Sequence, residues 1–361
     1  MKIVTVVGAR PQFIKVAAVS RILRENNTEI LVHTGQHYDA NMSDIFFQEL
    51  EIPQPDYNLQ VGSGSHAKQT AEILVKTEEI LLKEKPDYLL VYGDTNSTFA
   101  AALAASKLLI PAIHIEAGLR SFNMAMPEEQ NRILTDHISK VLFCPTDMAV
   151  DNLRKEGIIQ NVFQVGDVMC DAVRYYSGKM RNLPSAYFFE KLTYFYNFEK
   201  KIEKWYLATI HRAENTDNVS KIETVLDAFE QLNYPVIFPV HPRIKNTIGI
   251  LQKSKHYENI CFVEPLGYLE MLYFTQGAIK IITDSGGLQK EAYMLERNVV
   301  TLRQQTEWVE TLKGNHNILC SIEKNDILKA VYRTDIDKTF DSKIYGDGKA
   351  AEKICFHLSK F

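Results

Sequence analysis

The sequence is poor in cysteine and has no closely spaced cysteine pair. Its five cysteines are spread along 361 residues, and none belongs to a CxxC motif. This spacing favours reduced thiols, as in a cytoplasmic protein, over a disulfide framework or a zinc site.

Long apolar runs and an excess of positive charge are also missing. The N-terminal run MKIVTVV is too short for a signal peptide, and no run reaches the about 20 apolar residues of a membrane-spanning helix. The 41 Lys and Arg against 45 Asp and Glu give a net charge of -4, which does not suggest a nucleic-acid or anionic-membrane partner. We therefore expect a cytoplasmic protein with neither partner.

Short apolar runs alternate with amphipathic helical patterns along most of the chain. The candidate strands are Lys2–Val7, Glu29–Thr34, Tyr88–Gly93, Ala112–Glu116, Val141–Cys144, Val162–Val165, Trp205–Ile210, Val236–Val240, Ile260–Val263, Ile279–Thr283 and Val299–Leu302. This alternation predicts an α/β fold with doubly wound parallel sheets.

The alternation is interrupted once, at Tyr175–Lys204, a segment rich in Tyr, Phe and Lys. The chain is long enough for two domains with separate cores. We predict two Rossmann-like domains facing a cleft, residues 1–172 and 173–344, with a C-terminal helix in 345–361 packing back on the first. Ligands of such sheets bind at the carboxyl ends of the strands, so motifs are sought there.

The stretch IKIITDSGGLQKEAYMLE reads as a strand, a glycine turn and a helix. Ser285 can cap the helix, while Gly286 and Gly287 let a ligand approach its backbone N–H donors. Such a turn can bind an anion, usually phosphate, and Glu291 lies where it could accept hydrogen bonds from ribose. The alternative is an ordinary strand-to-helix turn.

The first strand leads into GARPQFIK, which is neither a GxGxxG fingerprint nor a Walker loop. Arg10 and Lys15 bracket a helix that starts with proline, an arrangement suited to a diphosphate. The alternative is a helix start with two solvated cations.

Carboxylates follow the next strands of the first half. Asp94 is either a helix N-cap or an ionised group of the site. Glu116 ends an apolar strand, where burial would favour its protonated form and suit it to proton transfer. Glu128 begins a helix, where negative charge is favourable in any case. Arg132, one turn later, could simply pair with Glu128.

Histidines occupy two strand ends of the second half and one loop of the first. His211-Arg212 and His241-Pro242-Arg243 each close a strand, and such residues are seldom buried unpaired. A metal site is the weaker reading, because no further ligand lies at suitable spacing. Gln36-His37 follows the second strand, where a lone histidine is more often a loop hydrogen-bonding residue.

Six pieces of the sequence together resemble a known family, the non-hydrolysing UDP-N-acetylglucosamine 2-epimerases. They are GARPQFIK, GDTNST, HIEAGLR with PEEQNR, HRAEN, PVHPR and TDSGGLQKEA, in the family's order over nearly the whole chain. The resemblance implies a GT-B-like fold, a homodimer, no metal and no cofactor. It implies inversion at C2 of a UDP-2-acetamido sugar, by anti elimination of UDP to a 2-acetamidoglucal and re-addition.

The resemblance also implies roles for individual residues. Positions that hold UDP are matched by Arg10, Lys15, His211, Ser285, Gly286, Gly287 and Glu291. Positions of acid–base work and diphosphate stabilisation are matched by Asp94, Glu116, Glu128 and His211. A sugar pocket or second site would include Gln36, His37, Arg132, His241 and Trp308.

Two departures from the family bear on the substrate. Trp308 stands where common members carry an arginine, and some bacterial members that resemble this chain in the TEWVE variant act on UDP-2,3-diacetamido-2,3-dideoxy-D-glucuronate. Asp39 and Lys68 replace contacts of a second, activating UDP-GlcNAc, so we do not expect that activation.

We therefore expect epimerisation of the UDP-GlcNAc to UDP-ManNAc type, serving bacterial surface-polysaccharide synthesis, with the diacetamido uronate as the alternative substrate. Two other classes remain open. A GT-B glycosyltransferase would share the nucleotide site, but the many carboxylates at the first domain's strand ends argue against it. A non-catalytic nucleotide-sugar binding protein would tolerate the loss of Glu116.

Overall fold

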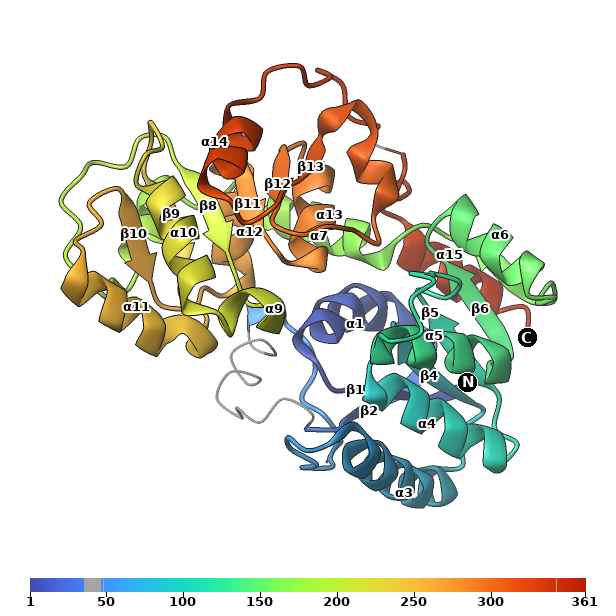
Figure 1. Cartoon of the computed structure of the whole chain (residues 1–361). Coiled ribbons are helices and arrows are strands. Elements are labelled where there is room, and N and C mark those ends of the chain that lie inside the picture. Colours follow the sequence, from blue (N-terminus) through green and yellow to red (C-terminus); the bar gives the residue numbers. More distant parts are fainter. Residues whose placement is uncertain (36–46, 48, 342) are drawn as a thin grey trace. The chain divides into compact units, whose positions relative to one another are not determined.

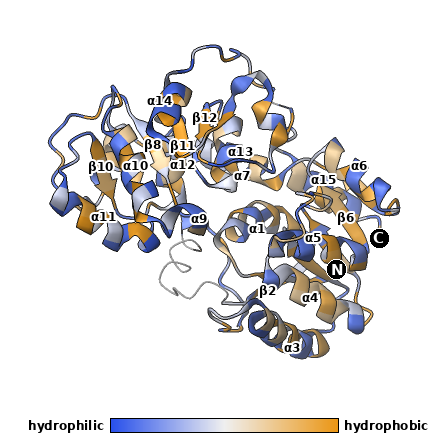
Figure 2. Ribbon diagram, viewed as in Figure 1, coloured by the Kyte–Doolittle hydropathy of each residue, from blue (hydrophilic) through white to orange (hydrophobic). Residues whose placement is uncertain are grey.

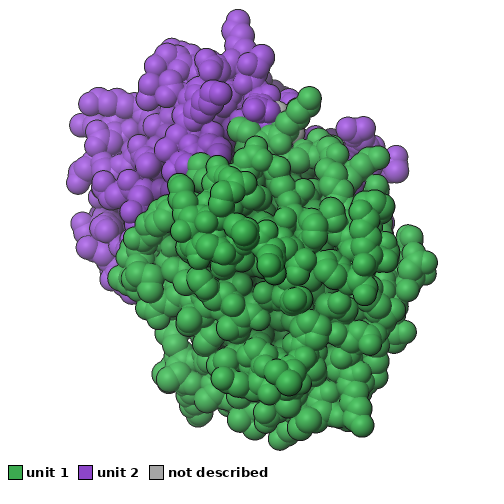
Figure 3. All heavy atoms as spheres, turned by 90° about the vertical axis from the view of Figure 1, so that its right-hand side faces the viewer, with its two compact units in different colours: residues 1–174, 342–361 green, residues 175–341 purple. Residues whose placement is uncertain are grey.

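The computed structural model describes residues 1–35, 47, 49–341 and 343–361, with only the backbone of Arg10. It divides into two compact units, residues 1–174 with 342–361, and residues 175–341 (Figure 3). We call these unit 1 and unit 2. Compactness alone does not establish independent folding, so the predicted domains, 1–172 with 345–361 and 173–344, stay a prediction.

Unit 1 contains a seven-stranded parallel sheet in the order β3-β2-β1-β4-β5-β6-β7 (Figure 1). Its strands are β1 (Lys2–Val7), β2 (Thr28–His33), β3 (Tyr57–Asn58), β4 (Tyr88–Tyr92), β5 (Ala112–Ile115), β6 (Val141–Cys144) and β7 (Val162–Gln164). Its helices are α1 (Arg10–Leu23), α3 (His66–Glu84), α4 (Asn96–Lys107), α5 (Pro127–Ile138), α6 (Asp147–Lys155), α15 (Ala350–Leu358) and the first part of α7 (Val168–Met180).

Unit 2 contains a six-stranded parallel sheet in the order β10-β9-β8-β11-β12-β13. Its strands are β8 (Tyr206–Thr209), β9 (Val236–Pro239), β10 (Ile260–Val263), β11 (Ile281–Thr283), β12 (Val299–Thr301) and β13 (Asn317–Leu319). Its helices are α8 (Ser185–Glu190), α9 (Ala213–Thr216), α10 (Val219–Phe229), α11 (Pro242–Ser254), α12 (Tyr268–Gly277), α13 (Gly286–Met294), the 3₁₀ helix η1 (Val309–Asn315) and α14 (Lys324–Tyr332).

In both sheets the strand order reverses direction once, between β1 and β4 in unit 1 and between β8 and β11 in unit 2. The crevice at the carboxyl ends of two such strands is where doubly wound folds bind ligands. The predicted α/β class is therefore confirmed, and each unit has one topological switch point.

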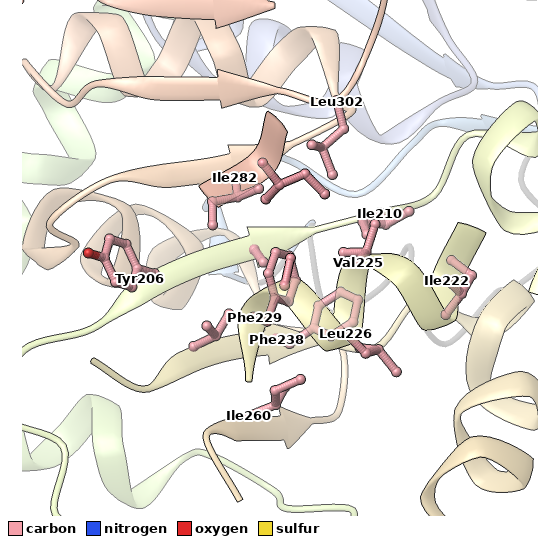
Figure 4. Close-up of a cluster of buried hydrophobic side chains, with 14 of the residues drawn as sticks. Tyr206, Ile210, Ile222, Val225, Leu226, Phe229, Phe238, Ile260, Ile282 and Leu302 are labelled. Atoms are coloured by element: carbon pink, nitrogen blue, oxygen red, sulfur yellow. The ribbon is translucent and has the colours of Figure 1, made fainter. Parts of the chain in front are cut away.

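The strands are short and almost wholly apolar because parallel strands are covered on both faces. Figure 2 shows apolar residues concentrated along them. In unit 2 the core joins β8, β9, β10, β11 and β12 to the inner face of α10, whose Val225, Leu226 and Phe229 belong to one buried cluster with Phe238 and Ile282 (Figure 4). No helix in the described part of the chain is long and apolar enough to cross a membrane.

The C-terminal helix α15 packs against α1, as predicted. The Asp171 carboxylate, from α7, accepts hydrogen bonds from the backbone N–H groups of Ala350 (3.0 Å) and Ala351 (2.8 Å) and so caps α15 from a distance. The helix begins at Ala350 rather than near Tyr345, because Gly346 and Gly348 have φ of 95° and 74°, which a helix does not allow.

Candidate functional site

A buried ion pair joins α1 to the end of β5 in unit 1. Lys15, in α1, places its ammonium against the carboxylate of Glu116, and both residues are buried. Glu116 turns out of β5 with a φ of 71°, an unusual conformation for a residue with a side chain. Glu116 is buried, as expected from the sequence, and the neighbouring ammonium adds a charge that the sequence expectation did not include.

Gly93 provides the space for this pair. Its φ is +64°, and a Cβ there would lie 3.1 Å from Glu116 Oε2 and 3.3 Å from Lys15 Nζ. The turn after β4 therefore brings the backbone that leads to Asp94 directly against the Lys15–Glu116 pair. Three of the predicted site residues are thus gathered at the carboxyl ends of β1, β4 and β5.

Asp94 is an ion-pair partner, not a helix cap. Thr95 caps α4, since its side chain accepts from the N–H of Thr98. The Asp94 carboxylate accepts instead from Arg132 Nη2 at 2.5 Å. Arg132 Nη1 donates to Glu129, so the expected pairing with Glu128 was wrong. Burial acts to lower the pKa of Arg132, but the Asp94 and Glu129 carboxylates outweigh it and raise that pKa.

Glu128 and Glu129 differ sharply in environment although they are neighbours. Glu128 is exposed in the first turn of α5, where the helix dipole favours a carboxylate. Glu129 is 1% exposed and accepts hydrogen bonds from the backbone N–H groups of Ser121 (2.9 Å) and Phe122 (2.8 Å). Of the two, only Glu128 is placed to meet a ligand from solvent.

A buried polar network behind Glu116 was missed by the sequence analysis. The Asp136 carboxylate accepts from Arg120 Nη1 (2.7 Å) and the Gly118 N–H (3.1 Å), and its other oxygen lies 2.7 Å from His114 Nδ1. His114 Nε2 lies 2.7 Å from the carbonyl oxygen of Gly93. Burial acts to raise the pKa of Asp136, but His114 and Arg120 outweigh it and lower that pKa. The signal was available, because HIEAGLR places ionisable groups inside and just after an apolar strand.

In unit 2 a single buried carboxylate joins the strands at the switch point. Asp284, which follows β11 and is 0% exposed, accepts from the backbone N–H groups of His211 (3.0 Å) and Arg212 (3.0 Å) beyond β8 and from Asn215 Nδ2 (3.0 Å). The His211 side chain is 40% exposed, and its Nε2 lies 3.7 Å from Asp284 Oδ1. His241, the N-cap of α11, has its ring centroid 5.8 Å from that of His211.

The glycine turn after β11 has one blocked and one open position. Ser285 caps α13 by accepting from the Leu288 N–H (3.4 Å), as predicted. A Cβ at Gly286 would lie 2.1 Å from Glu307 Oε1, whereas one at Gly287 would meet only Ser285 Oγ, at 4.0 Å. Glu291 is buried one turn further on. A ligand can therefore approach the start of α13 at Gly287.

Arg212 and Arg303 flank this turn, and Arg303 was not singled out from the sequence. Glu307 Oε2 lies 3.0 Å from Arg303 Nη1, and Glu307 Oε1 lies 3.8 Å from Arg212 Nη2. Trp308 is buried, with the ammonium of Lys290 4.2 Å from its ring centroid. The indole therefore packs against a cation of its own unit.

Some of the predicted site residues fall outside the part of the chain that the structure describes. Gln36 and His37 lie outside the described residues, as does the Arg10 side chain. Within the described part of the chain, no group of three or more His, Cys, Asp or Glu residues could hold a metal ion.

Known proteins with similar sequences belong to one family of nucleotide-sugar epimerases. The profile of a family described as UDP-N-acetylglucosamine 2-epimerase matches residues 21–359. A UDP-N-acetylglucosamine 2-epimerase homolog of Methanococcus maripaludis is 52% identical over 358 residues, covering 98% of both chains. The UDP-2,3-diacetamido-2,3-dideoxy-D-glucuronate 2-epimerase of Pseudomonas aeruginosa is 45% identical over 370 residues, covering 100% of both.

Solved structures give the same result over the full length of the chain. The UDP-GlcNAc 2-epimerase of Methanocaldococcus jannaschii, in complex with UDP-GlcNAc and UDP, has a TM-score of 0.89 at 40% identity, covering 100% of both chains. The enzyme from Neisseria meningitidis bound to UDP-GlcNAc has a TM-score of 0.89 at 32% identity, with the same coverage. The chain shares their GT-B-like α/β fold, and it belongs to the UDP-N-acetylglucosamine 2-epimerase family of isomerases.

Proposed function

We propose that this chain inverts C2 of a UDP-2-acetamido sugar, converting UDP-GlcNAc to UDP-ManNAc or the reverse. The observation that carries the proposal is the group of charges at the carboxyl ends of β1, β4 and β5, where Lys15 pairs with Glu116 and Arg132 pairs with Asp94. Each carboxylate is held in place by a neighbouring cation, and positioned carboxylates are the groups that general acid–base catalysis uses.

The reaction requires proton transfer on two faces of the sugar. A base removes the C2 proton, the C–H electrons form the C1=C2 double bond, and the C1–O bond breaks with its electron pair leaving on UDP. A proton is then delivered to the opposite face of C2 while the UDP oxygen bonds again to C1. Nothing is oxidised or reduced overall, so no redox cofactor is required. We assign these transfers to Asp94, Glu116 and Glu128 together, without deciding which removes the C2 proton.

Unit 2 would hold the nucleotide. The start of α13 offers backbone N–H donors at the open Gly287 position, beside the Ser285 cap. Glu291 would accept hydrogen bonds from the ribose, and His211 would bind the diphosphate. In unit 1, Arg10 and Lys15 stay predicted diphosphate ligands by their motif. His211 would also stabilise or protonate the leaving UDP, because its ring is partly exposed beside Asp284.

A second substrate is favoured by a specific observation. The relative from Pseudomonas aeruginosa is named for UDP-2,3-diacetamido-2,3-dideoxy-D-glucuronate, and it matches this chain over its full length. This chain also has Trp308, a buried indole beside the Lys290 ammonium, where common members of the family carry an arginine. We further propose a homodimer that works in the cytoplasm and serves surface-polysaccharide synthesis.

Proton NMR in deuterated water tests the function directly. The purified chain is incubated with UDP-GlcNAc and, separately, with the diacetamido uronate. Deuterium at C2 together with a growing signal of the epimer is expected for the true substrate. Absence of exchange with both sugars would refute the epimerase reading, whereas exchange with the uronate alone would identify it as the substrate.

A further inference from the structure

Glu129 connects a surface turn to the site, although it touches no solvent. Its carboxylate accepts from the backbone N–H groups of Ser121 and Phe122 and from the guanidinium of Arg132. At 1% exposure this carboxylate is stable only because all three donors are present. The residue is therefore tied to the loop before α5 and to a side chain within α5.

The Ser121–Phe122 turn, at one end of this connection, has an unfavourable backbone conformation. Phe122 has a φ of 57°, rare for a bulky residue, and it is 78% exposed. Met124, in the same loop, is 59% exposed. Two successive N–H groups of this turn bind one carboxylate, in the manner of an anion-binding nest, and a bond from Gln130 Nε2 to the Met124 carbonyl (2.9 Å) also holds the loop. The loop runs between Glu116 and Glu128, two residues of the proposed site.

At the other end of this connection, side chains of α5 bind Asp94. Arg132 divides its guanidinium between Glu129 and Asp94, and Asn131 Nδ2 donates to the backbone carbonyl of Asp94 at 3.0 Å. Asp94 is therefore held at its side chain and at its backbone by neighbouring residues of α5. Because one guanidinium serves two carboxylates, the charge on Glu129 limits how strongly Arg132 binds Asp94.

We propose that Glu129 is a positioning residue that couples the Ser121–Phe122 turn to Asp94 through Arg132. It fixes the direction of the Asp94 carboxylate and leaves that carboxylate free enough to exchange a proton. The inference rests on the proposed function, because it assumes that Asp94 takes part in acid–base work.

The charged groups around Asp94 determine the expected pH response. Arg132 and Glu129 face it from α5, and Glu116, which also acts on Arg132, lies beyond Gly93 with Lys15 as its partner. Replacing Glu129 by glutamine removes one negative charge and leaves Arg132 bound to Asp94 alone. The acidic limb of the pH–rate profile should then move to lower pH.

Steady-state kinetics of Glu129→Gln provides the first test. We expect kcat to fall by about 10²-fold, as for a misplaced catalytic group, with KM changed by less than about threefold. Glu129→Asp keeps the charge, so its acidic limb should stay near that of the wild type. The matched control is Glu156→Gln, which removes a carboxylate paired with Arg120 (2.7 Å) in the same unit. Its pH profile should be unchanged.

Amide hydrogen exchange gives a readout that does not depend on turnover. In Glu129→Gln, amide hydrogen exchange should become faster both in the peptide that contains residues 121–126 and in the peptide that contains residues 93–98. In Glu156→Gln it should stay unchanged in both peptides. Faster exchange in 121–126 alone, or an unmoved pH profile, would overturn the coupling and leave Glu129 a local structural residue. Failure of the wild-type protein to exchange the C2 proton of the sugar would refute the proposed function separately. The amide hydrogen exchange pattern would still decide whether Glu129 couples the turn to Asp94.

Discussion

The ammonium of Lys15 and the carboxylate of Glu116 form a buried ion pair that ties the first helix to the end of β5. Lys15, which we expect to bind the diphosphate, thus contacts Glu116, which we expect to transfer a proton. Each compensates the charge of the other where both side chains are buried.

Replacing Lys15 by methionine should therefore impair catalysis more than nucleotide binding. Without its counter-ion the buried Glu116 carboxyl would favour the protonated form, and it could no longer accept a proton. We expect kcat to fall by about 10²–10⁴-fold, the usual contribution of general acid–base catalysis. Turnover measured beside UDP calorimetry checks this, with Lys15→Arg as the control that keeps the charge. A loss of UDP affinity with kcat intact would show that Lys15 serves the diphosphate alone.

Gly286 and Gly287 form a matched pair for testing the nucleotide site. Gly286→Ala should displace Glu307 from Arg303 and Arg212 and lower stability by about 1 kcal/mol or more without any ligand. Gly287→Ala meets open space, so stability should change by less than about 1 kcal/mol. Its methyl group would nevertheless obstruct a phosphate at the start of α13, and UDP affinity should fall about tenfold. Thermal unfolding and calorimetry measure the two effects; unchanged UDP affinity in Gly287→Ala would remove UDP from this turn.

Lys280 should make the stability of the chain depend on pH in the alkaline range. Burial and the charge of Arg333 lower the pKa of this lysine to about 8, although its ammonium donates to backbone carbonyls at the end of α14, including that of Val331 (2.6 Å). Between pH 8 and the ordinary lysine pKa of 10.5 the unfolded chain binds more protons, so folding becomes more favourable as pH rises. From pH 8 to 10 the wild type should gain about 2 kcal/mol relative to Lys280→Met. Urea unfolding of both proteins at each pH measures the difference. A constant difference would show that Lys280 keeps an ordinary pKa.

Trp308 and Lys290 should behave as a coupled pair. Trp308→Arg places a second cation against a buried ammonium, and we expect a loss of about 3 kcal/mol in unfolding free energy. Adding Lys290→Glu to that variant converts repulsion to attraction and should recover at least about 1 kcal/mol of the loss. A double-mutant cycle by urea unfolding checks the coupling. Strictly additive effects would mean that the two side chains do not interact.

The sequence predicted the fold well because buried parallel strands are short apolar runs, which are visible in a single chain. The edge strands β3 and β13 were missed, because they include polar positions such as Asn58 and Asn317 and are only partly buried. A polar residue within so short a strand interrupts the apolar run by which the other strands were recognised.

The site was predicted by position but not by pairing. The sequence placed Asp94 and Glu116 just after strands, as observed, but it offered Glu128 rather than Glu129 as the partner of Arg132. The buried face of α5 is polar, with Glu129, Arg132 and Asp136 turned inward, so no apolar stripe indicated which of two adjacent glutamates faces the protein. Ion pairs between distant segments, such as Lys15 with Glu116, leave no local pattern at all.

The return of α15 to unit 1 has a consequence for the order of biosynthesis. The ribosome delivers the seven strands of unit 1 first, then all of unit 2, and only afterwards the segment that supplies Ile354 and Leu358 to unit 1. Until then the face of α1 that receives α15 and the Asp171 carboxylate have no partner from that helix. The unit that begins the nascent chain is thus the last to be completed, and a premature stop within the final helix would damage the part of the protein synthesised earliest.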